Sequence, residues 1–326
     1  MYKTYHYESC LAPYIEGLIS EKRALGFAYE FEAYILKKFD EYCIDHNLEE
    51  AVISRPLLEE WKSRRNTESK GYRSQRVSFV RQLSLYMNSL GIPSYMPRNF
   101  TDQEKKVPHL LNDDEISAFF EAVDSYWPAV CNPSYVRLAV EYRILFRMIY
   151  CCGLRNSEAC SLKVSQVDLN TGIITIIHSK GDKDRLVYLS EDLQQLCTEY
   201  LKSLKDMTGL DPVWFFPSKN LEKPLPKTSA DARFNDSWEK TCYASNCDKK
   251  PTVHCLRHAY VIKRMNSWME QGIDLNVMML YLAKFLGHKG RNETFYYFHQ
   301  VEGAFAAIRK KDTHSRNVIP EVALDE

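Results

Sequence analysis

Six side chains in the second half of the chain are of types that together could transfer a phosphoryl group. They are Arg155 in GLRNSEA, Lys180 in HSKGDKDR, His254 and Arg257 in HCLRHAY, His288 in LGHKG, and one of the adjacent tyrosines Tyr296 and Tyr297 in NETFYYFHQ. Two guanidinium groups can neutralise a phosphodiester and its transition state, which metal ions do in other enzymes. A phenol can be the nucleophile, and a lysine can protonate the departing sugar oxygen. The set describes metal-free phosphoryl transfer through a phosphotyrosine.

Each motif also has an ordinary structural explanation when it is taken alone. An arginine after a helix can bind carbonyl groups, a lysine in a glycine turn is usually solvated, and an H-x-x-R pair occurs by chance. Because adjacent residues on a helix point about 100° apart, only one of the two tyrosines can face the arginines. It is the combination and order of the motifs that favour a common site.

A zinc site is an alternative use of the same region. Residues 242, 247, 254 and 258 occur as C-x4-C-x6-H-x3-H. Zinc fingers separate their ligand pairs by roughly a dozen residues, so a shorter spacing that includes Pro251 fits poorly. The sequence also has no Walker-type glycine loop, no G-x-G-x-x-G after a strand and no paired carboxylates at metal-ligand spacing. We therefore expect no metal and no cofactor.

Length and composition bound the class of protein. The chain has 326 residues, of which 45% are hydrophobic and 26% charged, and this is typical of a soluble protein with room for two domains. No apolar run approaches the ~18 residues of a membrane span. The N-terminus lacks the apolar core of a secretory signal, and the ten cysteines show no regular framework. We expect a cytoplasmic protein with reduced thiols and no membrane partner.

Charge is distributed unevenly along a chain whose net charge is zero. Residues 1–60 contain six Lys and Arg against twelve Asp and Glu, whereas residues 61–98 contain eight against one. This one-sidedness favours a polyanionic partner over a merely solvated helix face. The residues that we expect to contact it are Lys62, Arg64, Arg65, Lys70, Arg73, Arg76 and Arg81.

The first hundred residues have the period of amphipathic helices. Leu11, Ile15, Leu18 and Ile19 mark the first helix, and Ser54 can cap a later one. A long helix follows over 74–91. In it Val77, Val80, Leu83, Leu85 and Met87 should point one way, and Arg73, Arg76 and Arg81 should face outward.

A proline-rich stretch without periodicity ends this first domain, and we place the linker at 101–107. The second domain, 108–326, begins with a helix that Asn112 can cap, with Glu115 three residues on. Strands are expected at 173–178 and 186–189, joined by a glycine-containing turn. Helices should follow over EDLQQLCTEYLKSL, ARFNDSWEKTCYA, LRHAYVIKRMNSWMEQG and LNVMMLYLAKFLG. The predicted class is mainly α with a small antiparallel β-sheet.

The order GLRNSEA, SKGDKDR, HCLRH and LGH followed by a tyrosine resembles the tyrosine recombinase (phage integrase) family. The resemblance implies a helical core-binding domain at 1–100 and an α+β catalytic domain at 108–326. The interval between His254 and His288 is longer than in the Xer recombinases and is similar to that of recombinases carried by mobile elements. The chain also begins directly at the core-binding domain, so we expect simple core sites rather than distant arm sites.

The resemblance also implies a role for each motif residue. Arg155 and Arg257 would clamp the scissile phosphate, with Glu158 supporting Arg155. Lys180 would be the acid for the leaving 5′ oxygen, His254 the acid–base partner, and His288 would hold the phosphate or orient the nucleophile. The family's nucleophile falls nine residues beyond the second histidine, at Tyr297. The implied substrate is duplex DNA with inverted core half-sites.

Two other functions remain open at this point. A type IB topoisomerase would use similar catalytic residues to relax DNA without sequence preference, and a non-catalytic DNA-binding regulator would keep the fold alone. The tail after the tyrosines has an apolar start, a basic stretch at 309–316 and a second apolar patch at Val318, Ile319, Val322 and Leu324. This pattern favours a tether that docks in a neighbour and links a tetramer on DNA, over a tail folded on its own domain or disordered.

Overall fold

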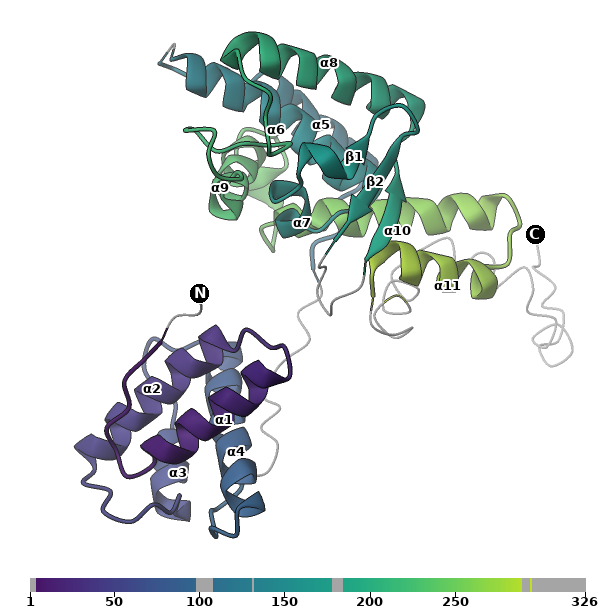
Figure 1. The fold of residues 1–326 in the computed structure, drawn as a ribbon. Helices are drawn as coiled ribbons and strands as arrows, with labels where there is room; N and C mark the ends of the chain where they lie inside the picture. Colours follow the sequence, from purple (N-terminus) through teal and green to yellow (C-terminus); the bar gives the residue numbers. More distant parts are fainter. Residues whose placement is uncertain (1–3, 98–107, 131, 178–183, 289–293, 295–326) are drawn as a thin grey trace, which may run out of the picture. The chain divides into compact units, whose positions relative to one another are not determined.

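The computed structural model describes residues 4–97, 108–130, 132–177, 184–288 and Thr294. The chain divides into two compact units, Met1–Val107 and Pro108–Glu326, which are described separately (Figure 1). The predicted fold class, mainly helical with a small antiparallel sheet, is confirmed. Among the described residues, none of the helices combines the length and the apolar character needed to cross a membrane.

The described part of the first unit consists of helices. They are α1 (Ala12–Ala24), α2 (Glu30–Asp45), α3 (Arg55–Trp61) and α4 (Lys70–Ser89). The predicted cap is confirmed, because the Ser54 hydroxyl accepts a hydrogen bond from the Leu57 backbone N–H. All four helices contribute to one core, in which Leu18, Leu36, Leu58 and Val80 are buried.

The predicted outward face of α4 is wrong at Arg76, which is 1% exposed. Its Nε and Nη2 donate to the two carboxylate oxygens of Glu68 at 2.7 and 2.8 Å, and its Nη1 donates to the Trp61 carbonyl. Arg76 therefore belongs to the interior of the unit. Leu85 is also placed wrongly by the prediction, because it is exposed on the opposite side of α4 from Leu83.

The second unit consists of helices and a small sheet, and one face of the sheet packs against the helical core. Its elements are α5 (Asp113–Asp124), α6 (Pro133–Cys152), α7 (Asn156–Cys160), β1 (Val167–Asp168), β2 (Ile173–Ile176), β3 (Arg185–Tyr188), α8 (Glu191–Thr208), α9 (Lys227–Trp238), α10 (Val253–Glu270) and α11 (Leu275–Leu286). The capping box predicted at the start of α5 is present, with Asn112 and Glu115 satisfying each other's backbone N–H groups.

The sheet has the order β1-β2-β3 and is antiparallel throughout. Ile174 pairs with Val187, and both are buried against the helical core, whereas Leu186 and Tyr188 point to the outer face. The predicted hairpin is confirmed over its described residues, and its turn lies outside them. The short strand β1 was not predicted, because two residues give no alternating pattern.

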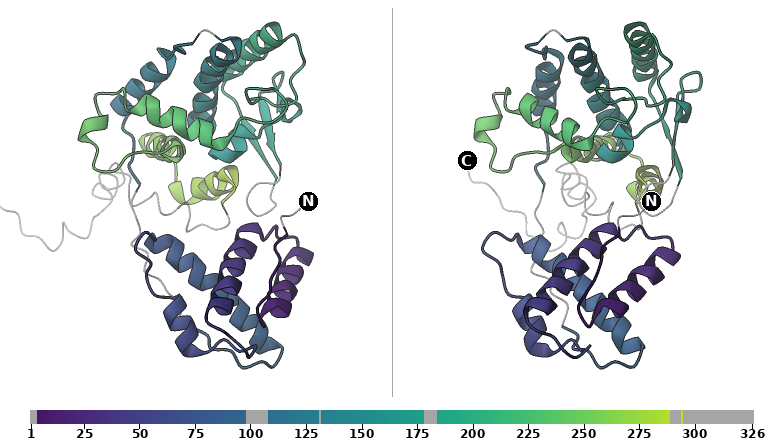
Figure 2. Two further views of the ribbon diagram at one scale, coloured as in Figure 1. Left: turned by 90° about the vertical axis from the view of Figure 1, so that its left-hand side faces the viewer. Right: turned by 60° about the vertical axis from the view of Figure 1, so that its left-hand side comes forward.

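Helix α10 packs along α6, and α11 lies beside α10 (Figures 1 and 2). This arrangement brings the C-terminal end of α6, the N-terminal end of α10 and the C-terminal end of α11 together. Gly153 ends α6 with φ 60° and Gly287 ends α11 with φ 64°. Both are left-handed positions that glycine occupies without strain.

Candidate active site

Backbone carbonyls at the end of α11 bind three arginines, which we call the arginine cluster. The pairs are Arg185 Nε with the Phe285 carbonyl (2.8 Å), Arg257 Nη2 with the Leu286 carbonyl (2.7 Å) and Arg155 Nη2 with the Gly287 carbonyl (2.8 Å). The last carbonyls of a helix have no partner within the helix and carry partial negative charge. The helix end is therefore a natural meeting point for cations from distant parts of the chain.

Local structure explains how two of these arginines arrive at the same place. Arg155 is the residue immediately before α7, two positions after α6 ends at Gly153. Arg257 lies in the first turns of α10, and its Nη1 donates to the Gly153 carbonyl at 2.6 Å. A Cβ at position 153 would lie 2.7 Å from the ring of Tyr260, so glycine permits the close approach of α6 and α10. The two arginines are thereby held by the same turn.

Glu158 bridges two arginines of the cluster. Its Oε1 accepts from Arg155 Nη1 at 2.6 Å and from Arg185 Nη1 at 2.9 Å, and its Oε2 accepts from Arg185 Nη2 at 2.6 Å. Burial alone would raise the pKa of this carboxyl group, but the hydrogen bonds and charges of Arg185 and Arg155 lower it to about 2. The expected contact between Glu158 and Arg155 is present, and the carboxylate is ionised.

His288 follows α11 and contacts the cluster through its ring. Its Nε2 lies 3.2 Å from Arg257 Nη2, and its Nδ1 lies 2.7 Å from the hydroxyl of the buried Thr294. Because a guanidinium can only donate, Nε2 is the acceptor and Nδ1 carries the proton. Burial and the charges of Arg257 and Arg155 lower the pKa of His288 to about 4, which keeps this ring neutral at pH 7.

His254 and His258 lie one turn apart near the start of α10, with ring centroids 4.6 Å apart. His254 retains contact with solvent, although the surrounding protein displaces bulk water from its ring. That loss of water, with the charges of Arg257, Arg155 and Lys227, lowers the pKa of His254 to about 4. Burial, and to a lesser extent the charges of His254 and Arg257, lower the pKa of His258 to about 3. Both imidazoles are neutral at pH 7.

The structure thus brings together four of the six predicted catalytic residues: Arg155, His254, Arg257 and His288. Lys180 and Tyr297, together with Tyr296, lie outside the described residues. Within the described residues, no group of three or more His, Cys, Asp or Glu side chains is placed to hold a metal ion. Arg257 is only 1% exposed, whereas Arg155 is partly exposed and lines a cavity with His254, so a bound oxyanion could meet a guanidinium and a neutral imidazole there.

Two cations near the site were missed by sequence reasoning. Arg185 stands in the quoted SKGDKDR motif, but an arginine at a strand start gives no sign of a buried partner. Lys227, at the start of α9, lines a cavity of about 450 Å³ together with Arg155 and His254. It stands 27 residues before His254 in a segment without any motif, so only the fold could reveal it.

The predicted DNA-binding residues of the first unit have different environments. Arg64, Arg65 and Lys70 are exposed around the loop between α3 and α4. Lys62 pairs with Glu59 at 3.0 Å. Arg73 and Arg81 are partly exposed, with their Nε atoms donating to the carbonyls of Lys62 and Pro97, and Arg76 is buried as described above.

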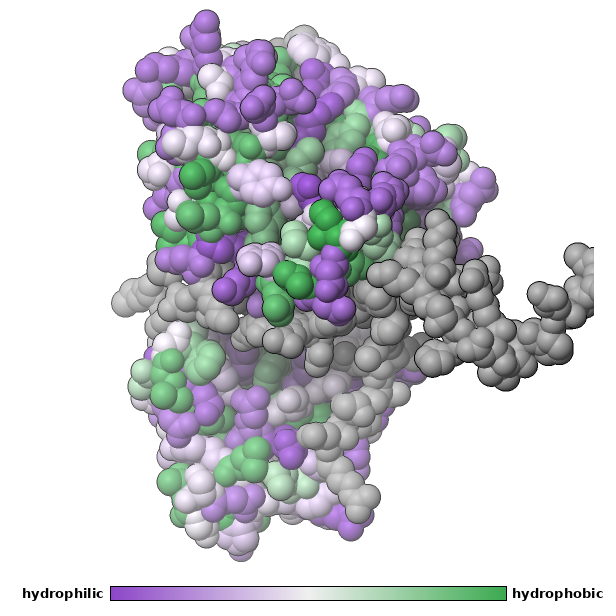
Figure 3. All heavy atoms as spheres, turned by 90° about the vertical axis from the view of Figure 1, so that its right-hand side faces the viewer, coloured by the Kyte–Doolittle hydropathy of each residue, from purple (hydrophilic) through white to green (hydrophobic). Residues whose placement is uncertain are grey.

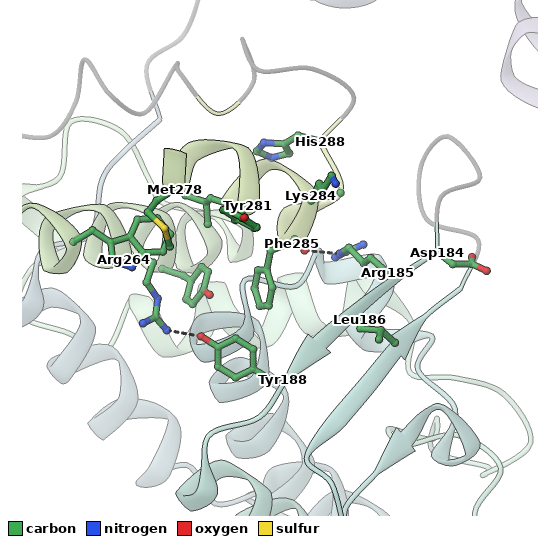
Figure 4. Close-up of a pocket in the computed structure, with 14 residues that line it drawn as sticks. Asp184, Arg185, Leu186, Tyr188, Arg264, Met278, Tyr281, Lys284, Phe285 and His288 are labelled. Atoms are coloured by element: carbon green, nitrogen blue, oxygen red, sulfur yellow. Dashed lines mark hydrogen bonds between the residues drawn. The ribbon is translucent and has the colours of Figure 1, made fainter. Parts of the chain in front are cut away.

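An apolar depression, which we call the α10–α11 groove, leads away from His288 with a volume of about 710 Å³. Its apolar lining comes from β3, α10 and α11 and includes Leu186, Tyr188, Trp268, Met278, Tyr281 and Phe285 (Figure 4). Leu186 and Tyr281 are more than 60% exposed. Figure 3 shows hydrophobic side chains gathered among hydrophilic ones on one face of this unit.

Comparison with known proteins identifies the class. A model described as the phage integrase family matches residues 110–303. Tyrosine recombinase XerA from Pyrococcus furiosus is 27% identical over 234 residues, which cover 70% of this chain and 71% of XerA. Tyrosine recombinase XerD from Pseudomonas aeruginosa is 29% identical over 215 residues, which cover 65% of this chain and 63% of XerD.

Solved structures show the same fold. The XerH site-specific recombinase bound to palindromic difH substrate gives a TM-score of 0.63 at 21% identity, covering 86% of this chain and 79% of XerH. The Tn1549 transposon integrase in complex with transposon right end DNA also gives a TM-score of 0.63, at 15% identity. The match covers 91% of this chain and 98% of the integrase chain. The chain belongs to the phage integrase family. It is a site-specific tyrosine recombinase that acts on DNA, as the motifs predicted.

Proposed function

We propose that this recombinase cleaves and rejoins each DNA strand through a 3′-phosphotyrosine on Tyr297. The phenol oxygen attacks the scissile phosphorus as its proton passes to His254. The bond from phosphorus to the 5′ oxygen breaks, and Lys180 protonates that oxygen. A 5′ hydroxyl from the partner strand then reverses these steps. One phosphodiester is exchanged for another, so no nucleotide energy source is needed.

The observation that carries this proposal is the convergence of Arg155 and Arg257 with His288 at the end of α11. Two guanidinium groups at one place can neutralise the added charge of a pentavalent phosphorane. The lowered pKa of His254, about 4, leaves its ring free to accept a proton at pH 7. A phosphate bound beside it would raise that pKa, because an anion offsets the nearby cations, and would make the ring a stronger base.

The two units have separate tasks in this proposal. Residues 1–100 form the core-binding domain. The exposed cations Arg64, Arg65 and Lys70 contact the DNA backbone. Lys62, Arg73 and Arg81, which lie on the same loop and helix, contribute to the same DNA-binding surface. Residues 108–326 form the catalytic domain. Arg76 is excluded from the DNA-contacting set because it is buried against Glu68.

The substrate that we propose is duplex DNA with inverted core half-sites. XerH, which has the same fold, was solved on a palindromic substrate. Because exchange joins two such sites and each half-site takes one protomer, four protomers assemble on DNA.

The test of this mechanism uses the purified full chain and a half-site selected from a random duplex pool by binding and covalent capture. A nicked duplex with this half-site should yield a covalent adduct in excess EDTA and without ATP. Arg155→Ala and Arg257→Ala should lower the adduct rate on the order of 10²- to 10³-fold and leave duplex binding almost unchanged. A strict need for a divalent metal would contradict the mechanism. Relaxation of plasmids that lack the half-site would instead favour a topoisomerase.

We also propose that the tail links the protomers. The apolar patch Val318, Ile319, Val322 and Leu324 would dock in the α10–α11 groove of a neighbouring protomer. The basic stretch 309–316 gives the patch a polar spacer, and the groove has exposed apolar residues to receive it. Since the groove ends beside His288, a docked tail would contact the helix that carries the active site.

Truncation after Arg316 should keep half-site binding and reduce cooperative binding to paired half-sites. Tyr281→Lys, a charge placed at a 64% exposed groove position, should have the same effect. Leu210→Lys is the matched control, because Leu210 is 58% exposed just after α8 and does not line the groove. Equal cooperativity in all four proteins, measured by gel-shift titration, would refute the tether. Loss on truncation but not in Tyr281→Lys would place the tail elsewhere.

A further inference from the structure

Arg185 uses its guanidinium group differently from Arg155, whose side chain is 18% exposed. Its Nε donates to the Phe285 carbonyl, and its Nη1 and Nη2 donate to the two oxygens of Glu158 at 2.9 and 2.6 Å. All three nitrogens therefore have protein partners, and the side chain is only 6% exposed. Arg185 is placed to hold other protein groups rather than a substrate.

These contacts join three elements at one point. Arg185 is the first residue of β3, Glu158 lies on α7, and Phe285 lies in the last turn of α11. Figure 4 shows Arg185 reaching from the strand toward the end of α11, with its bond to the Phe285 carbonyl. The fixed fork of a guanidinium makes this bridge directional, which a lysine ammonium cannot reproduce.

Glu158 transmits the effect of Arg185 to Arg155. The carboxylate binds both guanidinium groups, and its Oε2 also accepts from the Arg155 backbone N–H at 2.9 Å. Without Arg185, the ionised carboxylate would have Arg155 as its sole ionic partner and could rotate toward it. Arg155 would then be more fully neutralised and differently oriented.

The backbone between the two arginines is tightly confined. A Cβ at Gly287 would lie 3.1 Å from Arg185 Nη1 and 3.4 Å from Arg155 Nη1. The end of α11 thus passes close to both guanidinium groups, and the position of each depends on the other. Displacement of Arg185 would also free the Phe285 carbonyl.

We propose that Arg185 is a positioning residue of this recombinase. It fixes Glu158 and the end of α11, and so orients Arg155 for the negative charge that develops on the scissile phosphate. This inference rests on the proposed role of Arg155 as a phosphate clamp. Because the interaction strengthens only as charge develops, loss of Arg185 should slow cleavage and leave duplex binding intact.

The experiment compares single-turnover cleavage of two nicked half-site duplexes by the full chain. One has an ordinary scissile phosphate, and the other has a methylphosphonate, which lacks one negative charge and needs less cationic stabilisation. Arg185→Lys and Arg185→Ala should lower the rate on the ordinary duplex on the order of 10- to 100-fold. On the methylphosphonate, the difference from wild type should largely disappear, as it should for Arg155→Ala.

Arg137→Lys controls for the loss of a buried arginine. Arg137 on α6 is 3% exposed, pairs with Glu141 and donates to the Ser218 carbonyl at 2.8 Å, so it has no partner in the cluster. Thermal unfolding first establishes that Arg137→Lys is as fully folded as wild type under the assay conditions. Its cleavage rate relative to wild type should then be the same on both duplexes.

The possible results separate the inference from the proposed function. An equal deficit of the Arg185 variants on both duplexes, with Arg155→Ala rescued by the methylphosphonate, would overturn the positioning role alone. If Arg155→Ala is not rescued either, the phosphate-clamp role fails and the inference fails with it. Wild-type rates in Arg185→Lys on the ordinary duplex would also overturn the inference.

Discussion

The guanidinium group of Arg155 and the carbonyl oxygen of Gly287 are joined by a 2.8 Å hydrogen bond across 132 positions of sequence. The bond connects the turn after α6 to the residue that follows α11, directly before His288. A residue proposed to hold the scissile phosphate is thus attached to the chain segment that continues, nine residues after His288, to Tyr297. In the proposed mechanism, the residue that binds the phosphate is therefore bonded to the residue directly before His288.

Gly287→Ala should lower both stability and cleavage. A side chain at φ 64° costs roughly 1–2 kcal/mol, and the new Cβ would lie 3.1 Å from Arg185 Nη1. Gly209→Ala is the control, because Gly209 has φ 66° and a Cβ there would meet nothing within 4 Å. Chemical unfolding should show similar losses in both variants, whereas single-turnover cleavage should fall only in Gly287→Ala. Equal cleavage rates would show that the end of α11 does not need to approach the arginines closely.

Arg76→Met should destabilise the first unit by about 3–5 kcal/mol, because it leaves the carboxylate of Glu68 buried without its partner. Arg73→Met, on the same helix, should cost less, about 0.5–1.5 kcal/mol, because Arg73 is partly exposed and its Nε donates to a neutral carbonyl rather than to a buried carboxylate. Urea unfolding of the full chain measures the difference. Similar small losses in both variants would mean that Arg76 is not part of the interior.

Neutralising Arg64 and Lys70 to glutamine should flatten the salt dependence of duplex binding. Each phosphate contact that is lost lowers the slope of log K against log salt by about 0.9. Both side chains are exposed, so stability should not change. Lys22→Gln on α1 provides the control for loss of one cation elsewhere in the unit. An unchanged slope in the double variant would place this loop away from DNA.

Stability should fall on mild acidification because of the neutral histidines. In the folded chain the pKa of His288 is about 4, whereas an unfolded histidine titrates near 6.5. As the pH falls below about 6.5, the unfolded state binds protons first, so the free energy of unfolding decreases until the pH approaches 4. Glu158, whose pKa is lowered from 4.5 to about 2 in the folded chain, adds to the decline in the lower part of this window, because the unfolded carboxylate begins to bind protons below about pH 5.5.

Urea unfolding between pH 7.5 and pH 5 would measure this effect. The His288→Asn variant should show a shallower decline than wild type, because it lacks one of the groups that the unfolded state protonates. His254 and His258 titrate in the same direction and remain in the variant, so part of the decline should persist. Identical declines in the two proteins would contradict the lowered pKa of His288.

Helices with explicit capping residues were predictable from the sequence. Ser54 and the Asn112–Glu115 box marked helix starts that the structure contains, and the two apolar runs joined by a glycine-containing turn marked the hairpin. Leu85 was misjudged because it lies two residues from Leu83, about 200° around the helix. Arg76 was misjudged because a sequence displays a charge but not the partner eight residues away that allows its burial.

The site was partly predictable for a related reason. Arg155, His254, Arg257 and His288 stand in short motifs whose order carried the resemblance, and the fold groups them. Arg185 and Lys227 owe their places to strand direction and helix packing, which no local pattern encodes. The carbonyls of α11 that organise the arginines are backbone atoms, so the identity of residues 285 and 286 gave no indication of their role.

We propose that Tyr297, and not Tyr296, becomes covalently joined to the DNA. The measurement is covalent adduct formation on the nicked half-site duplex by Tyr297→Phe and Tyr296→Phe, followed by mass spectrometry of the DNA-linked peptide from wild type. Tyr297→Phe should form no adduct while it binds the duplex normally, Tyr296→Phe should form it, and the linked residue should be Tyr297. An adduct that persists in Tyr297→Phe and is lost in Tyr296→Phe would show that Tyr296 is the nucleophile instead.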